Sequence, residues 1–209
     1  MFITLLTHLL IGFLLSFIGS IPFGMINITV ADTAIKRGFT AGLWVGLGAA
    51  AVEFFQSFLA IQFTYLFLQN TALDFYFNII ALCIFIGLAI YYLLLQKPGQ
   101  ANKIKANEKK MNPFWKGVIV SLMNVLVFPY WIFYGAYLNT HGLLRLETIF
   151  VLTLCFGIFL GAMTTFVFFA KMGTWAINRG PHLMKFVNIF IGIIFLIFSF
   201  FQIWKIWKV

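Results

Sequence analysis

Residues 96–112 read QKPGQANKIKANEKKMN, a polar and lysine-rich stretch that separates two long hydrophobic parts of the chain. Its Pro-Gly pair is typical of a turn or loop. On both sides of this stretch, apolar runs alternate with breakers and charges and predict three membrane spans each. The predicted spans run near 3–30, 40–68, 74–95, 116–138, 147–170 and 183–205, and the first two are long enough to tilt or break.

The composition excludes a water-soluble fold. Of the 209 residues, 63% are hydrophobic and only 9% are charged, whereas soluble domains carry about a quarter charged residues. One span takes roughly 20 apolar residues to cross a hydrocarbon core of about 30 Å, so this length is filled by about six spans. We therefore expect one transmembrane domain over residues 1–209, with a first repeat over about 1–95, a basic cytoplasmic linker over about 96–115 and a second repeat over about 116–209.

The basic residues predict how the chain is oriented. If the N-terminus lies outside, eleven Lys and Arg residues fall on the inner side and three on the outer side, which is the bias that the positive-inside rule requires. We expect a multi-pass protein of the bacterial cytoplasmic (inner) membrane with both termini outside. The formal charge of +9 does not indicate nucleic-acid binding, because the basic residues lie between hydrophobic segments and not along one polar face.

An inverted repeat follows from the number of spans. Because three is odd, the second half must insert upside down relative to the first, as in many secondary transporters. Weak internal similarity supports this. The first spans carry Pro22 and Pro129, and the third spans share Phe-Ile-Gly at 85–87 and 190–192. Small residues recur every four positions in the second spans, namely Gly42, Gly46 and Ala50 in one and Gly157 and Gly161 in the other. The predicted fold class is an all-α integral membrane protein with six transmembrane helices arranged as two inverted three-helix repeats.

The first and fourth spans are predicted to break. A proline inside a helix removes a backbone donor and frees a carbonyl group, and irregular backbone at membrane depth is tolerated only inside protein or beside a watery cavity. The predicted hinge residues are Gly19, Pro22, Gly24 and Pro129. Asn27 follows the first break and Asn124 precedes the second, so both are candidates for lining a substrate site. The alternative is two ordinary kinks whose polar groups are satisfied locally.

Glu53 is the only acidic residue well inside a predicted span. An ionised carboxylate there costs about 2.5–3.5 kcal/mol, so Glu53 must be protonated, paired or facing water. It could exchange a proton during transport or neutralise the ammonium group of a substrate. The structural alternative is a hydrogen bond to Asn27 or Asn124. Gln56 lies on the same helix face, and the candidate substrate-binding or coupling residues are Glu53, Asn27, Asn124 and Gln56.

The remaining polar residues give no metal or cofactor pattern. Cys83 and Cys155 are isolated in apolar runs, and the three histidines are spread along the chain, unlike the spacings of metal sites. We expect no metal and no cofactor. A phosphate-binding loop is also missing from the sequence, so ATP is not the direct energy source.

Residues 20–53, SIPFGMINITVADTAIKRGFTAGLWVGLGAAAVE, resemble the N-terminal signature of the lysine-exporter (LysE/RhtB-type) superfamily of amino-acid exporters. The matching positions are Pro22, Gly38, Gly42, Gly48 and Glu53. Residues 114–124, FWKGVIVSLMN, resemble the family's Phe-x-x-Gly segment, which ends in an Asn-Pro pair beginning here at Asn124. The sequence departs from the family at Val52, where a Gly is expected, and at Val125, where the Pro is expected.

The resemblance implies a secondary exporter of amino acids or related small polar metabolites, driven by an ion gradient. Its partners would be a small-molecule substrate, a coupling ion that we expect to be the proton, and the lipid bilayer. The resemblance leaves open whether the protein forms a homo-oligomer. The competing hypothesis is a non-transporting membrane scaffold or assembly factor that retains the exporter fold. A membrane-embedded enzyme is a third reading, but the sequence has no paired nucleophile and base for it.

Overall fold

The computed structural model describes residues 2–21, 24–68, 111–124 and 126–173, together with scattered positions between 79 and 94 and between 189 and 207. The chain divides into two compact units, one of Met1–Tyr65 and Ile104–Gly180, the other of Leu66–Lys103 and Pro181–Val209. The predicted spans 74–95 and 183–205 belong to the second unit and lie largely outside the described residues.

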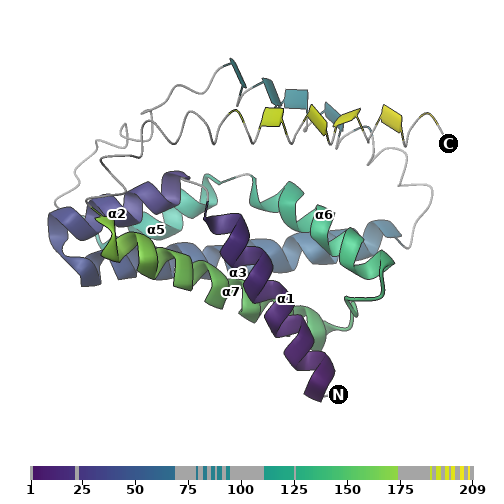
Figure 1. The fold of residues 1–209 in the computed structure, drawn as a ribbon, viewed down its shortest axis with the longest axis horizontal. Coiled ribbons are helices and arrows are strands. Elements are labelled where there is room, and N and C mark those ends of the chain that lie inside the picture. The colour runs from purple at the N-terminus through teal and green to yellow at the C-terminus, as the bar shows by residue number, and fades with distance from the viewer. Residues whose placement is uncertain are drawn as a thin grey trace. The chain divides into compact units, whose positions relative to one another are not determined.

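Six helices have described bounds (Figure 1): α1 (Phe2–Ser20), α2 (Met25–Arg37), α3 (Phe39–Leu68), α5 (Pro113–Leu122), α6 (Val127–Thr140) and α7 (Thr148–Lys171). Within the described residues, three stretches are long and apolar enough to cross a membrane by themselves, Phe2–Ser20, Phe39–Thr64 and Thr148–Lys171. Helices α5 and α6 pass the same test together, with a bend of 67° between them. The described part of the chain is therefore helical and membrane-like, as predicted, while the six-span inverted repeat stays a prediction.

The first predicted span, 3–30, is two helices and not one. Helix α1 ends at Ser20 and α2 begins at Met25, and Pro22 between them lies outside the described residues. Helix α2 continues beyond the predicted end, to Arg37, and stops at Gly38 with φ +91°. Glycine adopts this positive φ without the steric cost that a side chain would bring, so α3 can start directly afterwards.

The fourth predicted span is also interrupted, but before its proline. Asn112 caps α5 by accepting a hydrogen bond from Phe114 N at 3.0 Å, with Pro113 in the first turn. Helix α5 ends at Leu122 and α6 starts at Val127. Pro129 is the third residue of α6, and the N–H of the next residue, Tyr130, bonds to Leu126 O at 3.3 Å. Pro129 thus lies in the first turn, where a missing N–H costs no helical hydrogen bond.

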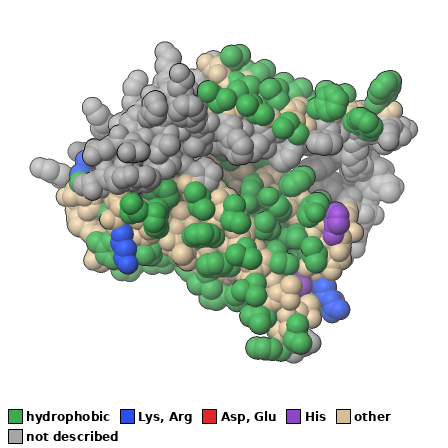
Figure 2. Space-filling model, in the orientation of Figure 1, with side chains coloured by type: hydrophobic (Ala, Val, Ile, Leu, Met, Phe, Trp, Pro, Cys, Tyr) green, Lys and Arg blue, Asp and Glu red, His purple; other side chains and the backbone are tan. Residues whose placement is uncertain are grey.

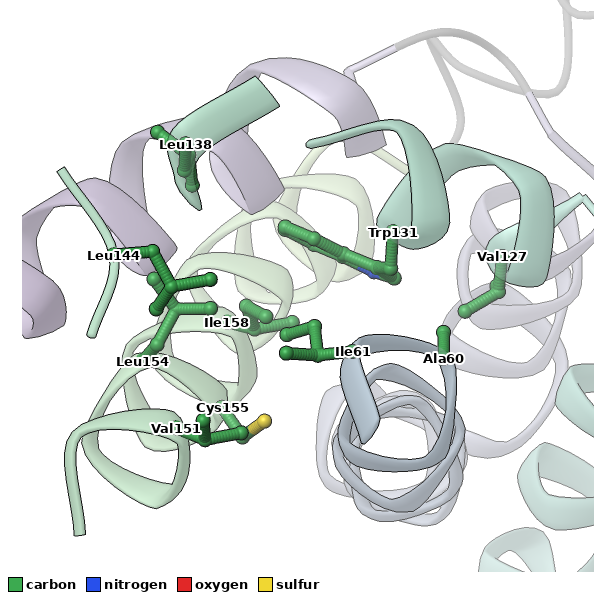
Figure 3. Packing of buried hydrophobic residues seen from close by; sticks show 10 residues of the cluster. All are labelled: Ala60, Ile61, Val127, Trp131, Leu138, Leu144, Val151, Leu154, Cys155 and Ile158. Atoms are coloured by element: carbon green, nitrogen blue, oxygen red, sulfur yellow. The ribbon is translucent and has the colours of Figure 1, made fainter. Parts of the chain in front are cut away.

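Two hydrophobic clusters fill the first unit. One joins α2, α3 and α7 and includes Val30, Val45, Ala50 and Phe166. The other joins α3, α6 and α7 around Trp131 (Figure 3), and its members are Ala60, Ile61, Val127, Trp131, Leu138, Leu144, Val151, Leu154, Cys155 and Ile158. Along α3, Glu53 follows the residues of the first cluster and precedes those of the second.

Helices α1 and α7 approach each other through glycines. A Cβ added at Gly12 would overlap the carbonyl oxygen of Leu154, and one added at Gly157 would overlap that of Leu9. Each glycine thus faces the carbonyl group three residues before the other glycine. Small residues allow such close helix approach in membranes, so the two backbones are in direct contact.

Helices α3 and α5 repeat this contact. A Cβ at Gly48 would overlap the carbonyl oxygen of Phe114, and one at Gly117 would overlap that of Val45, again three residues before the partner glycine. In both pairs, the first helix of one half of the chain packs against the long helix of the other half. The halves are therefore interleaved within this unit.

The Lys and Arg residues of the described ranges lie at two opposite ends of the helices. At one end, Arg37 donates to Met111 O at 2.8 Å and Lys116 donates to Thr33 Oγ1 at 3.3 Å. At the other end, Arg145 N donates to Nε2 of His8 on α1 at 3.1 Å. On the face shown in Figure 2, hydrophobic side chains cover the middle of the described part, with Lys and Arg at its ends. This distribution suits a bilayer between the two ends.

Candidate functional site

Glu53 lies inside the first unit, on α3, and only 9% of it is exposed. Its carboxyl group accepts a side-chain hydrogen bond from Trp131 on α6. Trp131 is itself 1% exposed, and its ring extends from α6 toward Ile158 on α7 (Figure 3). The carboxyl group is therefore held at a helix contact inside the protein and does not face lipid.

Tyr130 brings the end of α1 to the start of α6 beside Glu53. Its hydroxyl donates to Leu15 O at 2.9 Å and is close enough to Glu53 to interact with the charge of the carboxylate. Gly19 makes this approach feasible, because a Cβ at that position would lie 2.6 Å from the Tyr130 hydroxyl oxygen. Tyr130 also packs against Tyr134, with ring centroids 4.7 Å apart. The two helix interruptions thus approach each other through one tyrosine.

Gln56 connects α3 to the last turn of α5. It is 6% exposed, and its Nε2 donates to Ser121 O at 3.5 Å, while its Oε1 accepts no hydrogen bond within the described residues. Ser121 Oγ donates in turn to Ala49 O at 3.1 Å. The end of α5 is therefore bonded to α3 on both sides of Glu53.

Asn27 and Asn124 lie at the two interruptions. Asn27 is 4% exposed, and its Nδ2 donates to Ser20 O at 2.7 Å, across the break between α1 and α2. Gly24 lies in this break, immediately before α2, in an extended conformation. Asn124 lies in the second break, where its backbone N–H donates to Ser121 O at 2.9 Å. The structural partner expected for Glu53 was one of these two asparagines, whereas the observed partner is Trp131.

The structure therefore brings some of the predicted residues together and leaves others apart. Glu53, Gln56 and Gly19 share one neighbourhood through Tyr130 and Ser121, and Asn27 binds the end of the helix that carries Gly19. Sequence reasoning missed Trp131 and Tyr130. The available signal was the segment 129–134, PYWIFY, where three aromatic residues with polar groups follow a proline inside an apolar run.

The equivalence between the two long helices differs from the one that sequence spacing predicts. Thr164 follows Gly157 by seven residues, as Glu53 follows Gly46, which predicts that Thr164, and with it Thr165, completes the polar lining. The reciprocal contacts pair Gly48 with Gly157 instead, so Thr164 points outward and bonds only to Leu160 O of its own helix among the described residues. Thr165 is the buried residue, and its hydroxyl bonds to Phe17 O at 3.4 Å and to Gly161 O at 3.3 Å. The position that matches Glu53 is then Ala162, which has no polar side chain.

The comparisons with known proteins bear on the same region. No curated protein and no solved structure matches the chain. The family model described as LysE type translocator matches residues 17–205. This stretch includes Glu53, Gln56, both interruptions and the two long helices that the glycine contacts make equivalent. With nearly the whole chain matched, the protein belongs to the LysE type translocator family.

Proposed function

We propose that this protein is a secondary exporter of amino acids or related small polar metabolites in the bacterial cytoplasmic membrane, driven by an ion gradient. The observation that carries the proposal is the Glu53 carboxyl group, 9% exposed and adjacent to the tyrosine that joins both helix interruptions. Ionisable groups inside a membrane protein mark substrate and ion pathways, and interrupted helices are where transporters bind their substrates. Family membership agrees with this assignment.

Glu53 has two roles available, as the group that exchanges the coupling proton and as the counter-charge for a substrate ammonium. Trp131 would stabilise it when no substrate is bound. Because Trp131 belongs to α6, which follows the second interruption, a change in the angle between α5 and α6 would alter the hydrogen bonding of the carboxyl group. Substrate binding and the state of Glu53 would thereby depend on the same helix movement.

The reciprocal glycine contacts support an inverted repeat and suggest which parts move together. They join α1 to α7 and α3 to α5. At these contacts each glycine lies directly against a backbone carbonyl group of the partner helix, with no space for a side chain. The contact between α3 and α7 is made differently, since Gly46 faces the side chain of Phe166. We expect the α1–α7 pair and the α3–α5 pair each to move as a rigid body. The moving units would then not be the two halves of the sequence.

The expected orientation, with the N-terminus outside, is supported by where the described charges lie. Lys36, Arg37, Lys116 and Lys171 belong to the end of the first unit that contains the start of α5 and the end of α7, and Arg145 belongs to the opposite end. The first end would face the cytoplasm under the positive-inside rule.

An export assay tests the proposal in two steps. Extracellular metabolites are compared between cells with and without the protein, and the solute that accumulates is then measured in proteoliposomes. We expect Glu53→Gln to lower the flux about tenfold or more, because the substitution removes the charge and keeps the shape. Glu147→Gln, the same change at an exposed position, is the matched control and should leave the flux near the wild-type value.

Two results would contradict the proposal. Unchanged flux in Glu53→Gln would remove this carboxyl group from the mechanism. An identical metabolite profile with and without the protein would favour the scaffold hypothesis.

A further inference from the structure

Gln56 has a buried hydrogen-bond acceptor that nothing in the proposed function uses. Its Oε1 has no donor within the described residues, and an unsatisfied buried acceptor costs about 1–3 kcal/mol. The opposite amide orientation does not remove the problem. It would place Oε1 against the carbonyl oxygen of Ser121, which Nε2 now approaches at 3.5 Å, and two acceptors repel each other. A donor for Oε1 must therefore come from elsewhere.

Glu53 is placed to supply this donor. It precedes Gln56 by three residues on α3, so the two side chains are neighbours on one helix face. The side chain of Trp131 already donates to the carboxyl group. An ionised carboxylate only accepts hydrogen bonds, whereas a protonated one has an O–H to donate. A neutral Glu53 could therefore donate a hydrogen bond to Gln56 Oε1 from the same helix face, whereas an ionised Glu53 could not.

The surrounding groups do not replace this proton. From α6, the nearby titratable groups are Tyr130, whose hydroxyl donates to Leu15 O, and Tyr134, whose side chain bonds to Tyr130. From α7, Cys155 lies beside Ser57. The Lys and Arg side chains of the described ranges belong to the ends of the helices.

We propose that Gln56 is a positioning residue for the coupling proton: neutral Glu53 donates its O–H to Gln56 Oε1 while it accepts a hydrogen bond from Trp131. The inference deepens the proposed exporter function and rests on it. When the site opens, the O–H bond of Glu53 breaks, its proton passes to water on the open side, and the electron pair stays on the carboxylate. Gln56 then loses its donor, so the closed site favours the proton-loaded state.

Infrared difference spectroscopy of the purified protein in lipid, recorded over a pH titration, tests this without any substrate. The band to follow is the C=O stretch of a neutral carboxyl group, identified by its loss in Glu53→Gln. We expect Gln56→Met, which has similar length and no amide oxygen, to shift this band to higher frequency, because the O–H then lacks its acceptor. Thr165→Val is the matched control, since it removes a buried hydroxyl from α7 that already has partners, and it should leave the band in place.

The outcomes separate this inference from the proposed function. A band that stays in place in Gln56→Met, or a wild-type spectrum with no neutral Glu53 band at any pH, would overturn the inference even if transport is active. If the band shifts in Gln56→Met but the wild-type protein moves no solute, the exporter function is overturned and the proton shared by Glu53 and Gln56 is supported. If Glu53→Gln does not fold, ¹³C-labelling of glutamate in a Glu108→Gln/Glu147→Gln variant identifies the band, since Glu53 is then the one glutamate left in the chain.

Discussion

The Glu53 carboxyl group is tolerated inside this apolar unit because a neighbouring side chain donates a hydrogen bond to it. Glu53 is buried against α6, where hydrocarbon would cost an ionised form about 2.5–3.5 kcal/mol. The Trp131 side chain, itself almost fully buried, donates to it. Such an arrangement stabilises the carboxyl group in one geometry, as the proposed exchange of a proton by Glu53 would require.

Gly19 and Tyr130 should be energetically coupled. In Gly19→Ala, the new Cβ would lie 2.6 Å from the Tyr130 hydroxyl oxygen, and such overpacking costs about 1–3 kcal/mol. Tyr130→Phe removes that oxygen and also its bond to Leu15 O, at a cost of about 1 kcal/mol. The double variant should be more stable than the sum of the two changes predicts, because the clash is gone.

The coupling is measured as a double-mutant cycle from unfolding midpoints in detergent. Tyr137→Phe, on the exposed side of α6, replaces Tyr130→Phe in the control cycle and should give additive effects. Additivity in the Gly19–Tyr130 cycle would mean that the two residues are not in contact.

At the level of helices, Pro129 should be dispensable for stability. It lies in the first turn of α6, before the first residue whose N–H bonds within the helix. Pro129→Ala should therefore change the unfolding free energy by less than about 1 kcal/mol, and the transport rate should remain close to that of the wild type. A large loss of transport with unchanged stability would restore Pro129 as the hinge.

The reciprocal glycine contacts make a second prediction at this level. Gly12→Ala and Gly117→Ala each place a methyl group into a backbone carbonyl, and each should lower the unfolding free energy by about 1–3 kcal/mol. Gly87→Ala is the control, because no described atom lies within 4 Å of its Cβ position. It should be neutral, or stabilising by up to about 1 kcal/mol. Equal effects at all three positions would show that the contacts do not hold the helix pairs together.

The helices were predictable from the sequence to different degrees. The long apolar runs of α3 and α7 were readable because apolar length alone predicts a span. The break before α6 was predicted at Pro129 but lies before it. The sequence shows that proline lacks a backbone N–H donor. It does not show whether that position of the helix needs the donor. The four-residue spacing of small residues includes Gly46 and not Gly48, and the contact with the Phe114 carbonyl shows that Gly48 makes the backbone contact.

The sequence could predict a site residue only where that residue stands out by itself, without knowledge of its partner. Glu53 is conspicuous as a carboxyl group in an apolar segment, whereas its partner Trp131 lies 78 positions away on a helix with no periodic signal that would point it toward α3. Glu53 and Trp131 meet because α5 packs on α3 and α6 then turns by 67°. Pairings of this kind depend on tertiary packing, which a local pattern does not contain.

For the whole molecule, family membership was predicted from two short segments and is confirmed over residues 17–205. The orientation can be measured after replacing Cys83 and Cys155. We expect Leu143→Cys, in the exposed loop between α6 and α7, to react with a membrane-impermeant maleimide on intact cells. Asn112→Cys, at the start of α5, should react only after the cells are opened. The reverse pattern would show that the N-terminus lies inside.

The contact between α1 and α7 has a consequence for how the protein is made. Gly12 leaves the ribosome about 145 residues before Gly157, which is roughly 7–30 seconds at the usual rates of translation. During that interval the first helix sits in the bilayer with its glycine surface uncovered, open to other newly inserted helices. Cells that produce the N-terminal half alone should therefore degrade it quickly, and production of the C-terminal half from a second message should protect it.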